Sequence, residues 1–85
     1  MINKSGEFLE ELKVRRVMSK FSERLKELRL DRKLTQKKLA YILQTNNSSI
    51  CDWECGRAEP SIDMIIKLCT YLETSSDYLL GIEEY

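Results

Sequence analysis

Hydrophobic residues recur at three- and four-residue spacing along most of the chain, and they do not alternate with polar residues as they would in a half-buried strand. Residues 21–34 show an amphipathic pattern, with Lys and Arg between the apolar positions. The most regular pattern runs from residue 62 to residue 72 and predicts a further helix. Its apolar positions are Ile62, Ile65, Ile66, Cys69 and Leu72. The chain is therefore predicted to be all-α.

Polar residues that favour helix starts divide the rest of the chain into short helices. Each of four residues precedes an apolar stretch and carries a side-chain oxygen that can accept a hydrogen bond from the first turn. They are Thr35, Asn46, Ser61 and Ser75. Gly56 follows the stretch that begins after Asn46 and suits the left-handed backbone at a helix end. Together with the helix expected over residues 21–34, these signals predict a compact bundle of five helices.

The first 20 residues lack this regularity. The apolar side chains between residues 7 and 18 spread around a helical wheel, so they do not define a single buried face. We expect residues 1–20 to be an arm or an extra helix outside the core, residues 21–81 to be the folded domain, and residues 82–85 to be a short tail. No separate effector domain is expected beyond these three segments.

The composition excludes most catalytic and metal chemistry. The 85 residues include no histidine, three cysteines and three widely spaced glycines. A Ser-His-Asp triad, a Cys₂His₂ zinc site and a phosphate-cradling glycine loop are therefore ruled out. We expect no enzyme activity, no cofactor, no metal and no small-molecule substrate. No apolar run approaches the roughly 20 residues of a membrane span, so we expect a cytoplasmic protein with reduced thiols.

The formal net charge is zero, but the charges are unevenly distributed. Residues 1–57 hold 13 Lys and Arg against 8 Asp and Glu, whereas residues 58–85 hold 1 against 6. This asymmetry indicates a basic face and an acidic end. A basic face is typical of proteins that bind nucleic acid, although an uneven solvated surface gives the same counts.

Two short helices joined by a polar turn are what a helix-turn-helix requires, with the second helix in a DNA groove. Four short motifs occur in order along the chain. They are LTQKKLA at 34–40, ICDWECGR at 50–57, PS at 60–61 and DYLLG at 77–81. Over residues 21–81 the chain resembles the lambda-repressor-like, XRE-family DNA-binding domain. The resemblance implies a five-helix fold that binds double-stranded DNA, with a recognition helix at residues 46–55 in the major groove.

The same resemblance implies a transcriptional regulator of bacterial or phage type, associated with the nucleoid. We expect a repressor that acts by promoter occlusion. A single recognition helix reads only a few base pairs, so we expect a homodimer on a pseudo-palindromic operator whose half-sites lie about one DNA turn apart.

The resemblance also implies DNA contacts for particular residues. Gln36, at the start of the second helix, corresponds to a position that holds a phosphate. Asn47, Ser48 and Asp52 fall where the recognition helix meets base edges, and an Asn side chain can pair with adenine through two hydrogen bonds. Arg57 matches a phosphate contact. The full expected set is Gln36, Lys37, Asn46, Asn47, Ser48, Ser49, Asp52 and Arg57.

Other positions of the resemblance are structural. Arg29 and Glu54 match an ion pair that ties the first helix to the third. Core positions are expected at Leu39, Ala40, Leu43, Ile50 and Trp53. The turn position that the family usually fills with Gly is Gln44 in this chain, so either the turn is strained by about 1 kcal/mol or its geometry differs.

The expected dimer interface lies near the C-terminus, at Tyr78, Leu79, Leu80 and Ile82. Two alternatives remain open. One is an interface formed by Phe8, Leu9 and Leu12. The other is a role for either set in the core of the single chain.

Two further hypotheses come from residues that depart from a simple DNA-binding surface. Asp52 and the zero net charge favour, as the alternative function, a protein-interaction module of the same fold, such as an antitoxin or an anti-repressor. Cys51 and Cys55 stand four residues apart on the recognition helix, which raises a redox-switch hypothesis. A disulfide at this spacing would strain a regular helix, and the simpler interpretation is two ordinary thiols near the helix surface.

Overall fold

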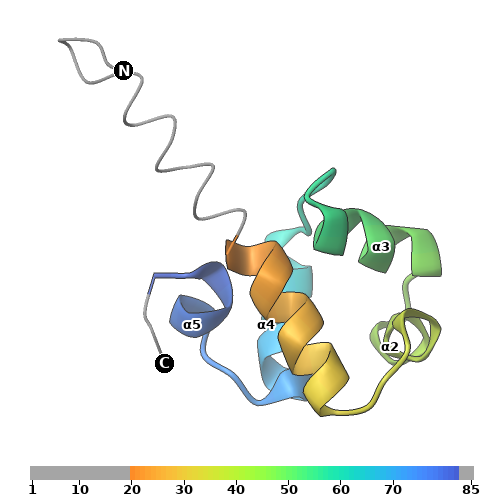
Figure 1. The fold of residues 1–85 in the computed structure, drawn as a ribbon, viewed down its shortest axis with the longest axis horizontal. Coiled ribbons are helices and arrows are strands. Elements are labelled where there is room, and N and C mark those ends of the chain that lie inside the picture. The colour runs from red at the N-terminus through yellow and green to blue at the C-terminus, as the bar shows by residue number, and fades with distance from the viewer. Residues whose placement is uncertain (1–19, 83–85) are drawn as a thin grey trace, which may run out of the picture.

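The structure is a computed structural model that describes residues 20–82. Over these residues it contains no strand, and a first helix covering residues 20–31 is followed by four more. They are α2 (Gln36–Leu43), α3 (Asn47–Cys55), α4 (Ile62–Leu72) and α5 (Ser76–Leu80). In Figure 1, α2 and α3 lie on one side of the first helix and α5 lies on the other, with α4 behind it. The predicted all-α, five-helix fold is confirmed, and none of the described helices is long and apolar enough to cross a membrane.

Both ends of the chain lie outside the described residues. The arm or extra helix predicted for residues 1–20 belongs to this part, apart from Lys20, and so does the surface formed by Phe8, Leu9 and Leu12. Residues 83–85 of the predicted tail belong to it as well. The expectations for these residues stay predictions.

Each helix after the first begins at a residue whose side chain completes the hydrogen bonding of the first turn. In all four cases the side-chain oxygen accepts a hydrogen bond of 2.8–3.1 Å from the backbone N–H three residues later. The four capping residues, all predicted from the sequence, are Thr35, Asn46, Ser61 and Ser75. Because these N–H groups have no acceptor within their own helix, the caps fix where each helix starts.

Left-handed backbone ends several of the helices. Gly56, after α3, has a φ of 80°, as predicted for a residue without a Cβ atom. Gln44, after α2, adopts the same region at φ 61° although it carries a side chain, which costs about 1 kcal/mol. Lys33 does so at φ 57°, and the first helix ends at residue 31, before the predicted end at Leu34.

The core receives side chains from the first helix and from all four that follow it. Its buried apolar residues are Phe21, Leu25, Leu39, Ala40, Leu43, Ile50, Trp53, Leu68, Leu72 and Leu79. The five core positions expected in the helix-turn-helix are all among them. Only Ile50 and Trp53 come from α3, so the core does not require the other side chains of that helix.

The helix predicted over residues 62–72 is present as α4, but only part of its regular apolar pattern faces the core. Ile62 and Ile66 are 79% and 58% exposed, whereas Leu68, which the predicted stripe omits, is fully buried. Ile65 and Cys69 are only partly buried against the core. The reason is that α4 carries apolar residues around most of its circumference, so more than one row of apolar side chains along the helix has the helical period. Contacts with neighbouring helices, and not the period, select the buried stripe.

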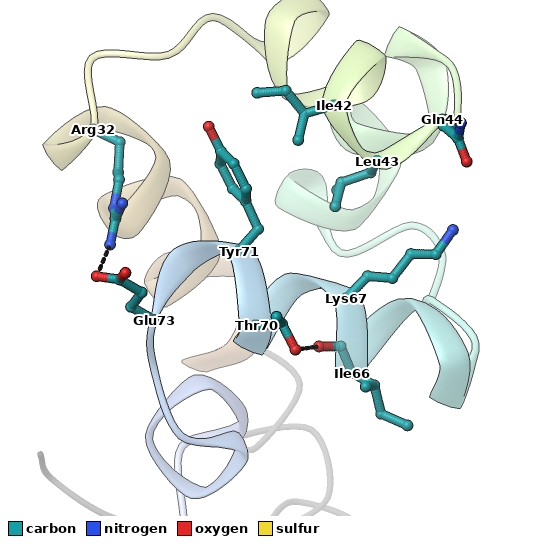
Figure 2. A pocket seen from close by; sticks show the side chains of 9 residues that line it. All are labelled: Arg32, Ile42, Leu43, Gln44, Ile66, Lys67, Thr70, Tyr71 and Glu73. Carbon is teal, nitrogen blue, oxygen red and sulfur yellow. Dashed lines mark hydrogen bonds and ion pairs between the residues drawn. The ribbon is translucent and has the colours of Figure 1, made fainter.

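The exposed side of α4 borders an open groove against α2, with a volume of about 580 Å³. Figure 2 shows Ile42 of α2 and Tyr71 of α4 among the side chains that line it, together with Ile66. Arg32 and Glu73 form an exposed ion pair of 3.0 Å at the border of this groove. Part of the α4 surface that does not enter the core is therefore apolar and solvent-exposed.

Candidate nucleic-acid interface

A short turn joins α2 and α3 into a helix-turn-helix. The N–H of Thr45 donates to the carbonyl oxygen of Ala40 at 2.9 Å, and the N–H of Gln44 donates to that of Tyr41 at 3.2 Å. Ala40 is 3% exposed, and its small side chain leaves room for neighbouring helices to approach closely. The turn therefore fixes the direction in which α3 leaves α2.

A buried ion pair anchors α3 to the first helix. Arg29 donates from Nε to Glu54 Oε2 at 2.7 Å and from Nη2 to Glu54 Oε1 at 3.1 Å, in a bidentate arrangement. The two side chains are only 7% and 3% exposed. Arg29 also donates from Nη1 to the carbonyl oxygen of Leu34 at 2.6 Å. The charge of Glu54 is thus neutralised inside the protein, and α3 is held in place.

Gln36, the expected phosphate contact on α2, belongs to the same cluster. Its Nε2 group donates to Glu54 Oε1 at 3.0 Å, which uses one of the two amide hydrogens. Lys37, beside it, is exposed. Phosphate binding at the start of α2 would therefore depend on the second amide hydrogen, on the exposed Lys37, and on the first backbone N–H groups, which have no acceptor within the helix.

The first turn of α3 presents polar side chains outward. Asn47 and Ser48 are exposed, and Ser49 is half-buried. Asn46 is exposed too, but its side-chain oxygen accepts the N–H of Ser49 at 2.8 Å as the helix cap. Asn47 and Ser48 are therefore the residues of this turn whose side chains are most free to meet a base edge.

Near the other end of α3, Asp52 and Arg57 bind each other. Arg57 Nη2 lies 2.9 Å from Asp52 Oδ1, and Arg57 Nε lies 3.1 Å from the same oxygen. The same Nη2 approaches Cys51 Sγ at 3.6 Å. The hydrogen bond to Asp52 raises the pKa of Arg57. Two residues expected to contact DNA separately, one at a base and one at a phosphate, are thus paired in the chain without DNA.

The expected dimer residues divide between the core and the surface. Leu79 is fully buried in the core of the single chain, and Leu80 is partly buried against it. Tyr78 lies under the guanidinium of Arg24, whose carbon is 4.1 Å from the ring centroid, and its carbonyl oxygen accepts from Arg24 Nη1 at 2.7 Å. Ile82 is 63% exposed. Leu79 is therefore a core residue of the single chain, which was the alternative interpretation of the expected dimer residues. Among these four residues, Ile82 has the exposed side chain.

Two features of this region are not apparent from the sequence patterns. The buried hydroxyl of Ser22 donates to the carbonyl oxygen of Trp53 at 2.7 Å, which adds a second tie between the first helix and α3. Tyr41 is 78% exposed on α2, and Lys38 Nζ lies 5.8 Å from its ring centroid. The position of Tyr41 could have been found from the sequence, because residues three and four apart, such as Lys38 and Lys37 from Tyr41, share one face of a helix. No sequence pattern indicates the hydrogen bond from Ser22 to Trp53.

Comparison with known proteins agrees with this geometry. The helix-turn-helix domain family matches residues 22–81. The HTH-type transcriptional regulator ImmR of Bacillus subtilis is 37% identical over 62 residues, which are 73% of this chain and 49% of ImmR. The HTH-type transcriptional regulator DdrOP3 of Deinococcus deserti is 40% identical over 67 residues, which are 78% of this chain and 52% of the relative. The HTH-type transcriptional activator BcrR of Enterococcus faecalis is 33% identical over 64 residues, or 75% and 31% of the two chains.

The matched stretch spans about half, or less, of the length of these relatives. No solved structure matches the chain. The family match nonetheless covers most of the sequence, including all of α2 and α3 and the turn between them. The chain therefore belongs to the helix-turn-helix domain family.

Proposed function

We propose that this chain binds double-stranded DNA sequence-specifically, in a transcriptional regulator, with α3 in the major groove. The observation that carries the proposal is the way α3 is held. Its inner side is fixed by Ile50 and Trp53 in the core and by Glu54 in a buried ion pair, while its first turn presents polar side chains outward. A rigidly supported helix with a polar outer face is what reading base edges in the major groove requires.

The proposed contacts follow the positions of the side chains around the two helices. Asn47 pairs with an adenine edge and Ser48 contacts a neighbouring base, because both are exposed at the start of α3. The first turn of α2 holds a phosphate, with Gln36 and Lys37 beside it. Arg57 holds a second phosphate beyond the end of α3.

The pairing of Asp52 with Arg57 sets a condition on this scheme. Arg57 must share or release Asp52 to reach a phosphate, and Asp52 is then free to accept a hydrogen bond from a cytosine amino group. Both side chains are well exposed, at 41% for Asp52 and 61% for Arg57. An exposed ion pair contributes at most about 1 kcal/mol, so a phosphate can compete with it.

The regulator is proposed to act as a cytoplasmic homodimer on a pseudo-palindromic operator and to repress by occluding the promoter. Two copies read two half-sites, which supplies the specificity that one short helix lacks. One of the relatives is named as an activator, so the sign of regulation needs its own test. A reporter gene with the operator inside its promoter loses expression when a repressor is added and gains expression when an activator is added.

DNA binding is tested by selection from a random duplex library, followed by fluorescence anisotropy of the selected sequence at two salt concentrations. Wild type is compared with Asn47→Ala and with Thr70→Ala, an exposed polar residue of α4 that serves as the matched control. We expect a palindromic sequence, a steep loss of affinity with salt, and weakened binding for Asn47→Ala alone.

A second candidate function is a protein-interaction module of the same fold. The Asp52–Arg57 pair favours it, because this pair neutralises a cation on the face proposed to meet DNA. Such a module gives no enriched sequence in the selection and binds DNA only weakly and without preference. That outcome would reject sequence-specific DNA binding and direct the search to a protein partner.

A further inference from the structure

Two thiols lie side by side near the end of α3. Cys51 Sγ and Cys55 Sγ are 3.9 Å apart, one helical turn from each other, and both cysteines are unpaired. Cys55 is exposed and Cys51 is half-buried. The third cysteine, Cys69, lies on α4 and packs partly against the core. The chain thus offers one close pair of accessible thiols and one separate thiol for comparison.

The thiol pair shares its helix face with the residue proposed to read DNA. Residues four apart on a helix lie above one another, so Asn47, Cys51 and Cys55 form one line along α3. Arg57, the proposed phosphate contact, donates toward Cys51 Sγ at 3.6 Å. Any chemistry at these two sulfur atoms therefore takes place within the proposed DNA-binding surface.

We propose that Cys51 and Cys55 form a thiol-oxidation site, at which a hydroperoxide converts the two thiols to a disulfide and the disulfide lowers the affinity for DNA. The effect on DNA affinity rests on the function proposed above. In the first step the sulfur of Cys55 takes an oxygen atom from the hydroperoxide, giving a sulfenic acid and releasing an alcohol, or water from hydrogen peroxide. In the second step the sulfur of Cys51 attacks the sulfur of Cys55. The displaced hydroxide leaves as water with the thiol proton of Cys51, so two thiols are oxidised and one peroxide is reduced.

The strain of this disulfide is the link to DNA binding. Residues four apart on a helix have Cβ atoms about 5–6 Å apart, whereas a disulfide holds them about 3.5–4.5 Å apart. The last turn of α3 must therefore deform when the bond forms. The Trp53 side chain in the core and the Glu54 side chain in its ion pair resist movement, at 6% and 3% exposed.

The deformation therefore falls on Cys55, which is the last residue of α3, and on the segment that follows it. There the N–H of Arg57 donates to the carbonyl oxygen of Asp52 at 2.9 Å, and the Arg57 side chain contacts Cys51. Both contacts depend on the regular geometry of the last turn. Oxidation thus displaces Arg57 from its proposed phosphate. Losing one contact to a phosphate or to a base weakens DNA binding by about tenfold.

The test uses the full chain, reduced and then treated with hydrogen peroxide. Thiol titration and intact mass are measured, and affinity for the selected duplex is measured on the same samples. We expect free thiols to fall from three to one, the mass to fall by two hydrogen atoms, and affinity to fall about tenfold, with recovery after reduction. Cys69→Ser should respond in the same way. Cys51→Ser and Cys55→Ser should form no internal disulfide, and peroxide should leave the affinity of each variant at that variant's own untreated value.

Three results would overturn the proposal. The first is a peroxide-treated chain that retains all three thiols, the second is a disulfide that joins two chains, and the third is an internal disulfide that leaves affinity unchanged. If the reduced chain binds no duplex at all, the proposed function fails and control of DNA binding fails with it. The thiol count and the mass then still decide whether Cys51 and Cys55 form an oxidation site.

Discussion

α3 and α4 differ in the side chains that they leave outside the core. α3 buries two apolar side chains, holds Glu54 in an ion pair, and leaves mainly polar groups and thiols outside. α4 buries Leu68 and Leu72 but leaves Ile62 and Ile66 in solvent. The comparison shows that a helix with few apolar residues has only one way to face the core. A helix with more apolar residues than the core accepts can be oriented only by its neighbours.

The largest expected effect concerns the anchor of α3. Glu54→Ala leaves the guanidinium of Arg29 buried without its carboxylate, and breaking a buried pair in this way costs about 3–5 kcal/mol. We expect a clear fall in the melting temperature, measured by circular dichroism, with no change in sequence preference. Glu73→Ala, in the exposed pair with Arg32, is the control and should cost at most about 1 kcal/mol. Native stability of Glu54→Ala would show that the pair does not anchor the helix.

The next effect tests which face of α4 is buried. Leu68→Ala removes a fully buried side chain and should destabilise the fold by about 2–5 kcal/mol. Ile66→Ala removes a side chain that is 58% exposed and should change stability by about 0.5 kcal/mol or less. The two free energies of unfolding are measured by urea denaturation. Equal costs for the two variants would contradict the orientation of α4 described above.

A smaller effect separates the two kinds of DNA contact on the α2–α3 side. Asn47→Ala should cost about 1–3 kcal/mol and relax preference at one base pair. Lys37→Ala should weaken binding to all sequences alike and reduce the salt slope by about one unit. Lys67→Ala, an exposed lysine of α4, is the matched control and should leave both quantities unchanged. Anisotropy titrations over a salt series measure the slopes, and a Lys37→Ala slope equal to that of wild type would remove Lys37 from the interface.

The smallest effect concerns the turn between the two helices. Gln44 has left-handed backbone, so Gln44→Gly should relieve roughly 1 kcal/mol of strain, less the entropy that glycine loses on folding. The expected result is a small rise in the melting temperature with unchanged DNA preference. A lower melting temperature would mean that contacts of the Gln44 side chain outweigh the backbone strain.

The parts of the fold that depend on local chemistry are predictable from the sequence. Thr35 and Asn46 cap their helices because a hydroxyl or amide oxygen lies within reach of an N–H three residues ahead, and this needs no knowledge of the rest of the chain. Gly56 ends α3 for an equally local reason. The order of helices, and with it the helix-turn-helix, follows from such signals.

Two side-chain pairings were beyond prediction from the sequence patterns. The side chain of Gln36 turns to Glu54, 18 residues away, and the surface ion pair of Asp52 with Arg57 depends on the path of the chain after Gly56. Neither spacing nor composition encodes these contacts. The same limit explains why a site expected as a row of separate DNA contacts contains residues already bound to each other.

The first helix makes contacts at both ends of the described fold. Ser22 and Arg29 hold it to α3, and Arg24 holds it to the carbonyl oxygen of Tyr78 in α5. In a dimer whose interface included α5, these contacts would help to set the distance between the two recognition helices. One base pair inserted between the half-sites rotates the second by about 34° and moves it by about 3.4 Å. Binding by such a dimer would therefore respond to operator spacing as well as to base sequence.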